Sequence, residues 1–343
     1  MEPILNKEPV AIRLPRSYDS DRLLADLRVL RDVDAAPQPG PYHKGEWTGI
    51  ALHSLGGKNS VFPSAPGLDH YRETESLKRT LYFKWILDDI QCPKEVVRIL
   101  FLPPGGHIKD HFDFHTSFRF GLLRLHIPII THPDVAFIID GERVSWAPGE
   151  LWYGDFSKVH SVKNDSPLVR THLVMDVQIN DFLLSLFPQD FVSRRRAEGI
   201  SMSRGPMPTS ESELRRYICD FRIPGELMPM FVIGKPLSTL TKGAMASVRV
   251  IDGKLTVLIN NEPAFCLERI SERTFSIAGL PPGITLQFHE EDNQIRQVVL
   301  DMKGLPRDLY SARLGMFQGP SIGERRVPLL VLGALPSAPG SMA

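Results

Sequence analysis

The sequence predicts a mainly β protein, a β sandwich or barrel with flanking helices, followed by a smaller antiparallel β domain. From about residue 96, short runs of β-branched and aromatic residues alternate with Gly, Pro, Asp and Asn, which is typical of successive strands. Beyond residue 225, an Asp-Gly pair joins two alternating runs in ASVRVIDGKLTVLIN, which indicates a β-hairpin. The length of 343 residues also favours two domains, at roughly 150 residues each.

The elements follow in order along the chain. Residues 18–31 predict a helix capped by Ser20 or Asp21, WTGIALHS a strand, and residues 73–90 a second helix. The strand-rich region from 96 ends in a helical segment over 180–197, and a Ser210/Glu213 capping box predicts a short helix over 210–220. We therefore expect a first domain over 1–195, a linker with a short helix over 196–224, and a C-terminal β domain over 225–343.

Composition excludes several classes of protein. The 40 basic and 40 acidic side chains cancel, which argues against an electrostatic nucleic-acid binder. The sequence has no run of 18 apolar residues, so no membrane span is predicted, and the N-terminus lacks the apolar core of a secretory signal. The three cysteines are scattered and form no metal or disulfide pattern. These features predict a cytoplasmic protein without membrane or nucleic-acid partners.

The histidines are concentrated in the strand-rich region, where the sharpest motif is His111-Phe112-Asp113. On an extended strand, residues i and i+2 point to one face, so this imidazole and carboxylate can bind one ion. His160, several strands later, can supply a third ligand from another strand. Two histidines and one carboxylate leave three coordination positions open, the facial triad of non-haem Fe(II) oxygenases. A 2-oxoacid takes two of these positions and O2 the third.

An arginine follows the third ligand at a useful distance. Arg170, ten residues after His160, can fork onto a carboxylate, such as the distal one of 2-oxoglutarate. His172 faces the same way, and Arg124 and His126 repeat the Arg-x-His pattern on another strand. A zinc hydrolase could use the same three ligands, but it would not need Arg170. Chance clustering also remains open, and His126 and His172 could be hydrogen-bonded core histidines.

Two stretches carry a family resemblance: PPGGHIKDHFDFHTSFRFGLLRLHIPI, and SWAPGELWYGDFSKVHSVKNDSPLVRTHLVMD. Together with KGEWTGIALHS and RLLADLRVLR, they resemble the aspartyl/asparaginyl β-hydroxylase family of Fe(II)/2-oxoglutarate dioxygenases, over about residues 10–185. Within it, the sequence is most similar to the L-proline cis-4-hydroxylase branch. The resemblance implies a double-stranded β-helix, or jelly roll, in the first domain.

The resemblance also implies roles for particular residues. His111, Asp113 and His160 match the iron ligands, Arg170 matches the 2-oxoglutarate anchor, and Arg124 and His126 match residues that line the co-substrate pocket. The peptidyl-aspartyl relatives lack the carboxylate ligand, so Asp113 favours the free-amino-acid branch and argues against halogenation. Arg98 matches an arginine that could grip a substrate carboxylate, and Trp47 a tryptophan near the active-site mouth; a surface or packing role is the alternative for each.

The sequence departs from the family in two places. The insertion FDFHTSFRFG follows His111 and is expected to reshape the substrate opening. The extra C-terminal domain faintly resembles small lipocalin-like β domains and carries no catalytic motif. It is interpreted as a scaffold for a homo-oligomer, a cap on the active site, or a module that recognises a carrier protein or peptide.

We therefore predict a dioxygenase that hydroxylates an sp³ carbon of a proline-like or other free amino acid, with Fe(II), 2-oxoglutarate and O2. A first alternative is hydroxylation of a residue within a peptide or on a carrier. A second is a non-catalytic, cupin-like protein that binds a metal or ligand.

Overall fold

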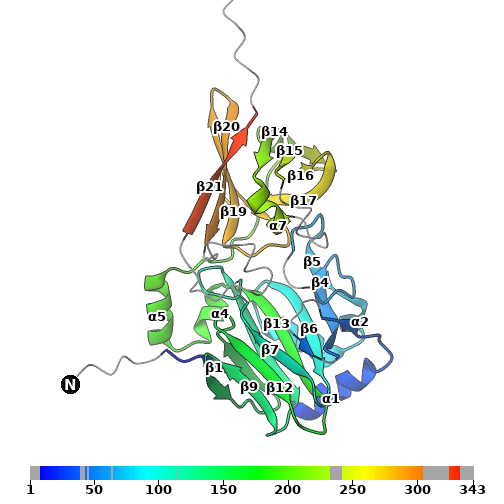
Figure 1. Ribbon diagram of the computed structural model, residues 1–343. Helices are drawn as coiled ribbons and strands as arrows, with labels where there is room; N and C mark the ends of the chain where they lie inside the picture. The colour runs from blue at the N-terminus through cyan, green and yellow to red at the C-terminus, as the bar shows by residue number, and fades with distance from the viewer. Residues whose placement is uncertain are drawn as a thin grey trace, which may run out of the picture.

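Two β units make up the protein, one stacked on the other (Figure 1). This computed structural model describes residues 8–38, 43–44, 46–62, 65–113, 115–231, 242–303 and 324–332. In Figure 1 the N-terminal unit lies below, with helices along its flanks, and the C-terminal unit lies above it. The mainly β fold class expected from the sequence is confirmed.

The lower unit is a jelly roll made of two facing antiparallel sheets. One sheet has the order β1-β11-β8-β13-β6-β4-β2, with β5 paired to β4, and the other has the order β10-β9-β12-β7-β3. The double-stranded β-helix that the resemblance implied is therefore present. The strands of the larger sheet are β1 (Ala11–Ser17), β2 (Ala36–Pro37), β4 (Thr48–Leu55), β5 (Tyr71–Glu73), β6 (Lys94–Leu102), β8 (Leu122–Ile130), β11 (Glu150–Gly154) and β13 (Arg170–Gln178). Those of the smaller sheet are β3 (His43–Lys44), β7 (His107–His111), β9 (Val135–Ile139), β10 (Glu142–Val144) and β12 (His160–Asn164).

The central strand β13 shows how sequence alternation builds the layers. Leu173, Met175 and Val177 are buried on the outer face of the large sheet, in a core shared with the helices. Arg170 and Asp176, offset by one position from this set, are also buried and belong to the opposite face of the strand. The side of β13 that faces the second sheet is therefore polar, and it carries the chemistry.

Helices cover the outer face of the large sheet, and two of the expected helices are each interrupted. The segment 73–90 forms α2 (Glu75–Lys78) and α3 (Leu81–Asp89), and the segment 180–197 forms α4 (Asp181–Ser185) and α5 (Gln189–Glu198). Pro188 separates the second pair because its ring cannot continue a helix. The first helix, α1 (Ser20–Val29), is capped by Asp19, whose side chain accepts from two backbone N–H groups, and not by the expected Ser20 or Asp21.

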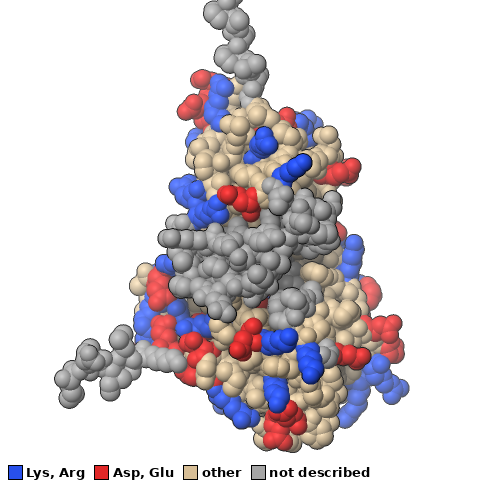
Figure 2. All heavy atoms as spheres, in the orientation of Figure 1, with Lys and Arg blue, Asp and Glu red and all other residues tan. Residues whose placement is uncertain are grey.

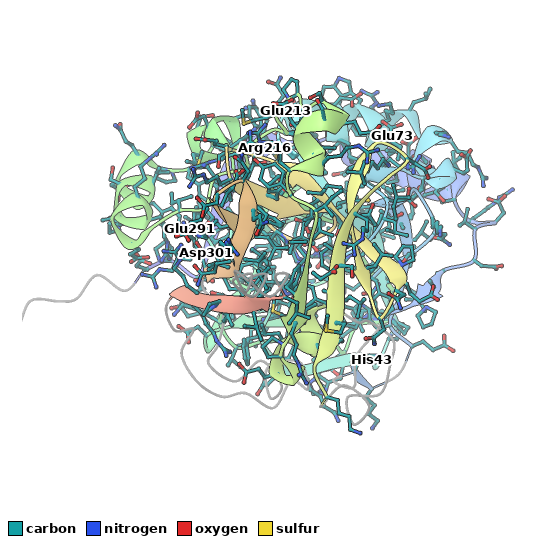
Figure 3. The ribbon with its side chains drawn as sticks, turned by 90° about the horizontal axis from the view of Figure 1, so that it is seen from above. His43, Glu73, Glu213, Arg216, Glu291 and Asp301 are labelled. Carbon is teal, nitrogen blue, oxygen red and sulfur yellow. The ribbon has the colours of Figure 1, made fainter. Side chains whose placement is uncertain are left out.

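The upper unit is a closed antiparallel barrel. The Asp-Gly hairpin forms as expected, because Asp252 and Gly253 both have positive φ. The Ser210/Glu213 capping box is also present, at the start of α6 (Glu211–Arg215). Figure 3 looks onto this unit from above and shows Glu213 and Arg216 on the side away from His43. Its strands are β14 (Cys219–Ile223), β15 (Ala244–Ile251), β16 (Lys254–Ile259), β17 (Glu262–Arg269), β18 (Thr274–Ile277), β19 (Ile284–Glu291), β20 (Gln294–Lys303) and β21 (Glu324–Val331), and the short helices η1 (Gly225–Leu227) and α7 (Met228–Phe231) follow β14.

Side chains fill the inside of this barrel. Phe221, Phe265, Phe275 and Phe288 are fully buried in one core cluster with aliphatic residues from the other strands. Strand β14 lies within the segment 196–224 that was predicted as a linker. The described strands therefore enclose an interior that is filled by side chains.

Backbone hydrogen bonds and glycines join the two units. The N–H of Gly67 donates to the carbonyl of Ala278 at 3.0 Å, and the N–H of Gly283 to the carbonyl of Phe120 at 2.8 Å. A Cβ on Gly279, where φ is +86°, would meet the Ala65 carbonyl oxygen at 1.8 Å, so a side chain does not fit there. The insertion after His111 contributes Phe120 to the core of the barrel, so it also joins the units.

The visible surface carries Lys, Arg, Asp and Glu side chains of both signs, interspersed over both units (Figure 2). This distribution agrees with the zero net charge of the sequence. Among the described residues, no helix is long and apolar enough to cross a membrane.

Candidate metal centre

Three side chains that could bind one ion meet between the two sheets. The ligand atoms of His111, Asp113 and His160 all lie within 4.8 Å of one another. His111 ends β7 and His160 begins β12, and these residues are paired directly across the two strands. Within the described part of the chain, no other group of three His, Cys, Asp or Glu side chains is close enough to share an ion.

Asp113 does not extend β7 as the i, i+2 argument supposed. The strand ends at His111, and Asp113 lies in the loop that follows. Its backbone N–H donates to the carbonyl of Phe156 at 2.8 Å, which holds the loop against the segment before β12. A tertiary hydrogen bond, and not strand periodicity, brings this carboxylate to the two imidazoles.

Backbone carbonyls set the tautomers of both histidines. Nδ1 of His111 lies 2.8 Å from the carbonyl oxygen of Lys109, and Nδ1 of His160 lies 2.9 Å from that of Lys158. A carbonyl oxygen only accepts, so each Nδ1 must carry the proton and each Nε2 the lone pair. Because a metal ion needs that lone pair, both imidazoles are oriented as ligands by their backbone neighbours.

Burial also keeps the imidazole of His160, the third candidate ligand, neutral. Burial, followed by the proximity of His111, lowers the pKa of His160 to about 3. Burial opposes ionisation of Asp113, but the charge of Arg124 outweighs it and holds the pKa of that carboxyl well below its usual range. At neutral pH His160 is therefore a neutral imidazole and Asp113 a carboxylate, and two imidazoles with one carboxylate suit a divalent transition metal.

Arg170 is buried beside this set without an opposite charge. It is 2% exposed, and among the described residues no carboxylate pairs with it. Its Nη2 donates to Nδ1 of His172 at 2.8 Å, and burial lowers the pKa of the guanidinium to about 9. Such a charge is costly to bury alone, so Arg170 fits the carboxylate of a bound 2-oxoacid.

A small cavity of about 50 Å³ connects His111 and His160 with Arg170. Phe137, Phe156 and Val162 give it apolar walls beside His111 and His160. Such walls exclude water from the space next to the proposed ligands. The other polar residues on the lining are Arg98, Arg124, His126 and Arg170, with Trp47 at the same cavity.

The remaining predicted residues occupy distinct positions around the centre. Arg124 pairs with Asp113 and Asp176, and His126 lies 3.3 Å from His172 between their Nδ1 atoms. Arg98 binds Asp176 at 3.0 Å and the carbonyl of Val61 at 3.0 Å. The small cavity is lined by Trp47, Arg98, Arg124, His126 and Arg170 together with His111 and His160, whereas His172 lines a second cavity with Arg170. Arg98 and Arg124 are occupied by ion pairs.

Sequence reasoning missed Asp176, which is fully buried and pairs with both Arg98 and Arg124. A signal was present, because Asp176 ends the RTHLVMD run and shares strand parity with Arg170 and His172. Gln38 was missed as well; it is 5% exposed and lies 3.5 Å from Arg98 between Oε1 and Nη1. No local pattern indicates that Gln38 belongs to the site.

The buried histidines predict an acid-sensitive fold in the absence of metal. Burial, then Arg170, lowers the pKa values of His126 and His172 well below 6.5, and burial lowers that of His160 to about 3. In the unfolded chain these groups bind protons below about pH 6.5, so stability is lost from there down towards pH 3. Urea unfolding should show a loss of up to about 2 kcal/mol for each such histidine between pH 7 and pH 5. A His126→Gln/His172→Gln protein should give a shallower slope, and an equal slope would contradict this account.

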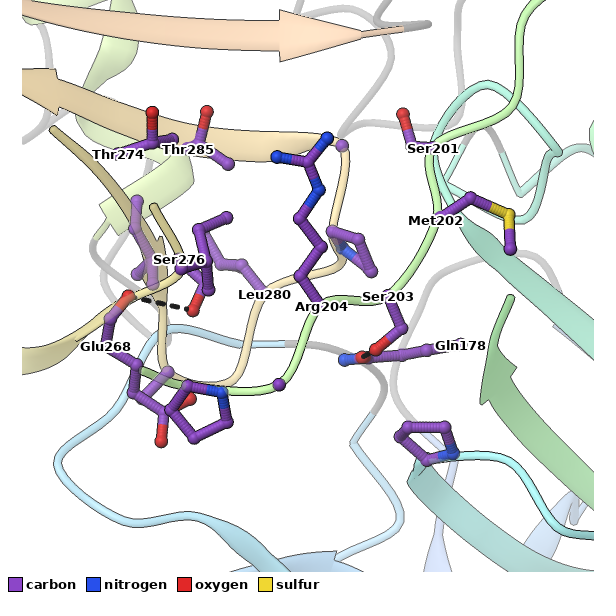
Figure 4. Close-up of a pocket in the computed structure, with 18 of the residues that line it drawn as sticks. Gln178, Ser201, Met202, Ser203, Arg204, Glu268, Thr274, Ser276, Leu280 and Thr285 are labelled. Carbon is purple, nitrogen blue, oxygen red and sulfur yellow. Dashed lines mark hydrogen bonds between the residues drawn. The ribbon is translucent and has the colours of Figure 1, made fainter. Parts of the chain in front are cut away.

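Another cavity, with a volume of about 490 Å³, lies between the two units (Figure 4). Thr274, Ser276 and Thr285 from the barrel face Ser203 and Gln178, which are joined by a hydrogen bond of 2.7 Å. None of the three candidate ligands lines this cavity, and its lining includes no buried arginine that lacks a carboxylate partner. The small cavity between the sheets is therefore the candidate reaction site.

Comparison with known proteins agrees with this location. Residues 24–179 match the family model described as Aspartyl/Asparaginyl beta-hydroxylase. This range includes all three candidate ligands, Arg170 and Asp176. No curated protein matches the sequence.

Solved structures give only distant likenesses. An oxidoreductase of the 2OG-Fe(II) oxygenase family from Burkholderia pseudomallei is 13% identical, with a TM-score of 0.36, over 49% of this chain and 85% of that one. A Pseudomonas putida prolyl-4-hydroxylase is 14% identical, with a TM-score of 0.33, over 50% and 93%. A predicted oxalate decarboxylase from Thermotoga maritima is 15% identical, with a TM-score of 0.25, over 43% and 97%. At these TM-scores nothing further is drawn from them.

Proposed function

We propose that the chain, whose residues 24–179 match the family model described as Aspartyl/Asparaginyl beta-hydroxylase, is an Fe(II)/2-oxoglutarate-dependent dioxygenase that hydroxylates an sp³ carbon. The observation that carries the proposal is the union of two neighbouring features. The ligand atoms of His111, Asp113 and His160 converge, and Arg170 lies buried on the same cavity as the two histidines, with no carboxylate partner among the described residues. A zinc hydrolase accounts for the first feature but not the second.

The residues have three roles: they bind the metal, orient the co-substrate and exclude water. Nε2 of His111, Nε2 of His160 and the carboxylate of Asp113 hold the metal, and Arg170 orients 2-oxoglutarate by its distal carboxylate. When bound, iron(II) supplies oxygen chemistry in which one oxygen atom enters the substrate and the other enters succinate, with release of carbon dioxide. The aromatic and aliphatic cavity walls keep water away from the reacting atoms.

The finer proposal is that the substrate is a free, proline-like amino acid. Three buried donors at or near the cavity have no hydrogen-bond partner among the described residues: Nε of Arg98, Nε2 of Gln38 and Nε1 of Trp47. Buried donors of this kind need an acceptor, and the α-carboxylate of a free amino acid supplies two oxygens. A residue inside a peptide has no α-carboxylate, so this feature favours a free amino acid over the peptide or carrier alternative.

An anaerobic titration with Fe(II) and 2-oxoglutarate tests the reaction class. A dioxygenase is expected to develop a visible charge-transfer band, and the Arg170→Ala protein is expected to lose it. No band in the intact protein would favour the non-catalytic, cupin-like alternative.

Succinate release tests the substrate class. A panel of free amino acids, including proline, is compared with peptides that contain the same residues in internal positions. We expect turnover with a free amino acid, and loss of about 10- to 100-fold in kcat/KM for Arg98→Met, which removes a charge-assisted bond to the carboxylate. Turnover that is confined to peptides would contradict the finer proposal and leave the dioxygenase intact.

A further inference from the structure

Four charged side chains form a continuous chain beside the candidate metal centre. In order they are Arg98, Asp176, Arg124 and Asp113, and we call them the ion-pair chain. Arg98 Nη2 lies 3.0 Å from Asp176 Oδ2, Arg124 Nε lies 2.6 Å from Asp176 Oδ1, and Arg124 Nη2 lies 3.1 Å from Asp176 Oδ2. Nη1 of Arg124 then donates to Oδ2 of Asp113. Two positive and two negative charges cancel within the chain.

All three nitrogens of Arg124 are used, which leaves the guanidinium one orientation. Nε and Nη2 fork onto Asp176, so Nη1 can point only towards Asp113. Asp176 is itself 0% exposed and held from the other side by Arg98. The position of the Asp113 carboxylate therefore depends on Asp176, which is linked to it through Arg124 and is not one of the three candidate ligands.

This arrangement also divides the two oxygens of Asp113. Oδ2 accepts from Arg124, whereas Oδ1 does not, so Oδ1 is favoured as the oxygen that binds a metal ion. A carboxylate that bound through both oxygens would occupy a second coordination position, and only two would stay open. A 2-oxoacid and O2 together require three.

On the basis of the proposed function, we propose that Asp176 is a positioning residue which, through Arg124, keeps Asp113 a ligand through a single oxygen and so preserves the third open position. Arg124 then supports the metal ligand instead of the co-substrate, the role that the family resemblance implied for it. Loss of a residue that hydrogen-bonds to a metal ligand, directly or through a neighbour, typically changes metal affinity by about 10- to 100-fold.

Metal binding in the absence of turnover tests this inference. The Kd for Mn(II), measured by electron paramagnetic resonance on the full chain, is expected to rise about 10- to 100-fold in Asp176→Asn. Glu95→Gln is the matched control, because Glu95 is also 0% exposed, lies on β6 in the same sheet, and binds Gln178 at 3.2 Å outside the ion-pair chain. Glu95→Gln should bind Mn(II) like the unmodified protein.

A second variant covers the case in which Asp176→Asn does not fold. Arg124→Lys retains the positive charge, but a single ammonium cannot fork onto Asp176 and reach Asp113 together. It should therefore show a similar loss of Mn(II) affinity. If the unmodified protein fails to bind Mn(II), the proposed function itself is wrong. If it binds and Asp176→Asn and Arg124→Lys bind equally well, the inference alone is overturned.

Discussion

The Asp113→Ala protein is expected to bind Fe(II) at least about 100-fold more weakly than the unmodified protein and to show no hydroxylation, because it lacks the only anionic ligand of the candidate centre. The two imidazoles would remain, but neutral ligands do not compensate the charge of a divalent ion. The fold should survive, since Arg124 retains both of its hydrogen bonds to Asp176. The cost should be about 1–2 kcal/mol, which lowers the melting temperature by only a few degrees.

The measurement pairs an Fe(II) titration with a thermal melt. Asp110→Ala is the matched control, because Asp110 is an exposed carboxylate on β7, one residue before His111. It should bind iron and turn over normally. Full hydroxylation by Asp113→Ala would exclude the proposed facial triad, whereas collapse of the melt would show that Asp113 serves mainly the fold.

Replacing Arg170 by Met is expected to move two measurements in opposite directions. Affinity for 2-oxoglutarate should fall about 100-fold, because a forked, charge-assisted contact to its distal carboxylate is lost. The ligand-free protein should become more stable, because a buried guanidinium without an opposite charge is replaced by an apolar side chain of similar length. A binding site that stores an unpaired charge is commonly less stable than its apolar variant.

Because 2-oxoglutarate affinity is expected to fall while stability rises, the two measurements together test the prediction more strictly than either one alone. Binding of 2-oxoglutarate is followed by calorimetry with Mn(II) present, and stability by the melting temperature without ligands. Arg72→Met removes an exposed arginine that pairs with Asp69 and should leave both measurements unchanged. A large loss of stability in Arg170→Met, or unchanged 2-oxoglutarate affinity, would remove Arg170 from the co-substrate site.

The sequence alone predicted many residues of the candidate site. The sequence predicted His111, Asp113 and His160 as candidate ligands, and the structure places their ligand atoms within 4.8 Å of one another, with Arg170 on the same cavity as the two histidines. The argument from strand periodicity was only partly right, because β7 ends at His111 and the Asp113 loop is held by the carbonyl of Phe156. The role of Asp176 was not predicted, because a lone aspartate in a hydrophobic strand has no visible partner in a sequence.

In the fold, too, some elements were predicted from the sequence and others were missed. The Asp252–Gly253 turn and the Ser210/Glu213 capping box formed as predicted, because both depend on residues a few positions apart. Strand β1 was not predicted, and its hydrogen-bonding partner, β11, lies more than a hundred residues away along the chain. The interruptions of the predicted helices at Thr80 and Pro188 were missed because periodic apolar residues continue across them.

By itself, then, the sequence predicted many of the local elements, the candidate metal ligands and a candidate cationic anchor, since each depends on residue type and short-range order. Tertiary structure alone decided that Arg124 pairs with Asp113 and Asp176, that Arg170 has no carboxylate partner among the described residues, and that the C-terminal strands close around a filled core. These outcomes depend on which strands become neighbours, and an unpaired or shared charge exists only once that arrangement is complete.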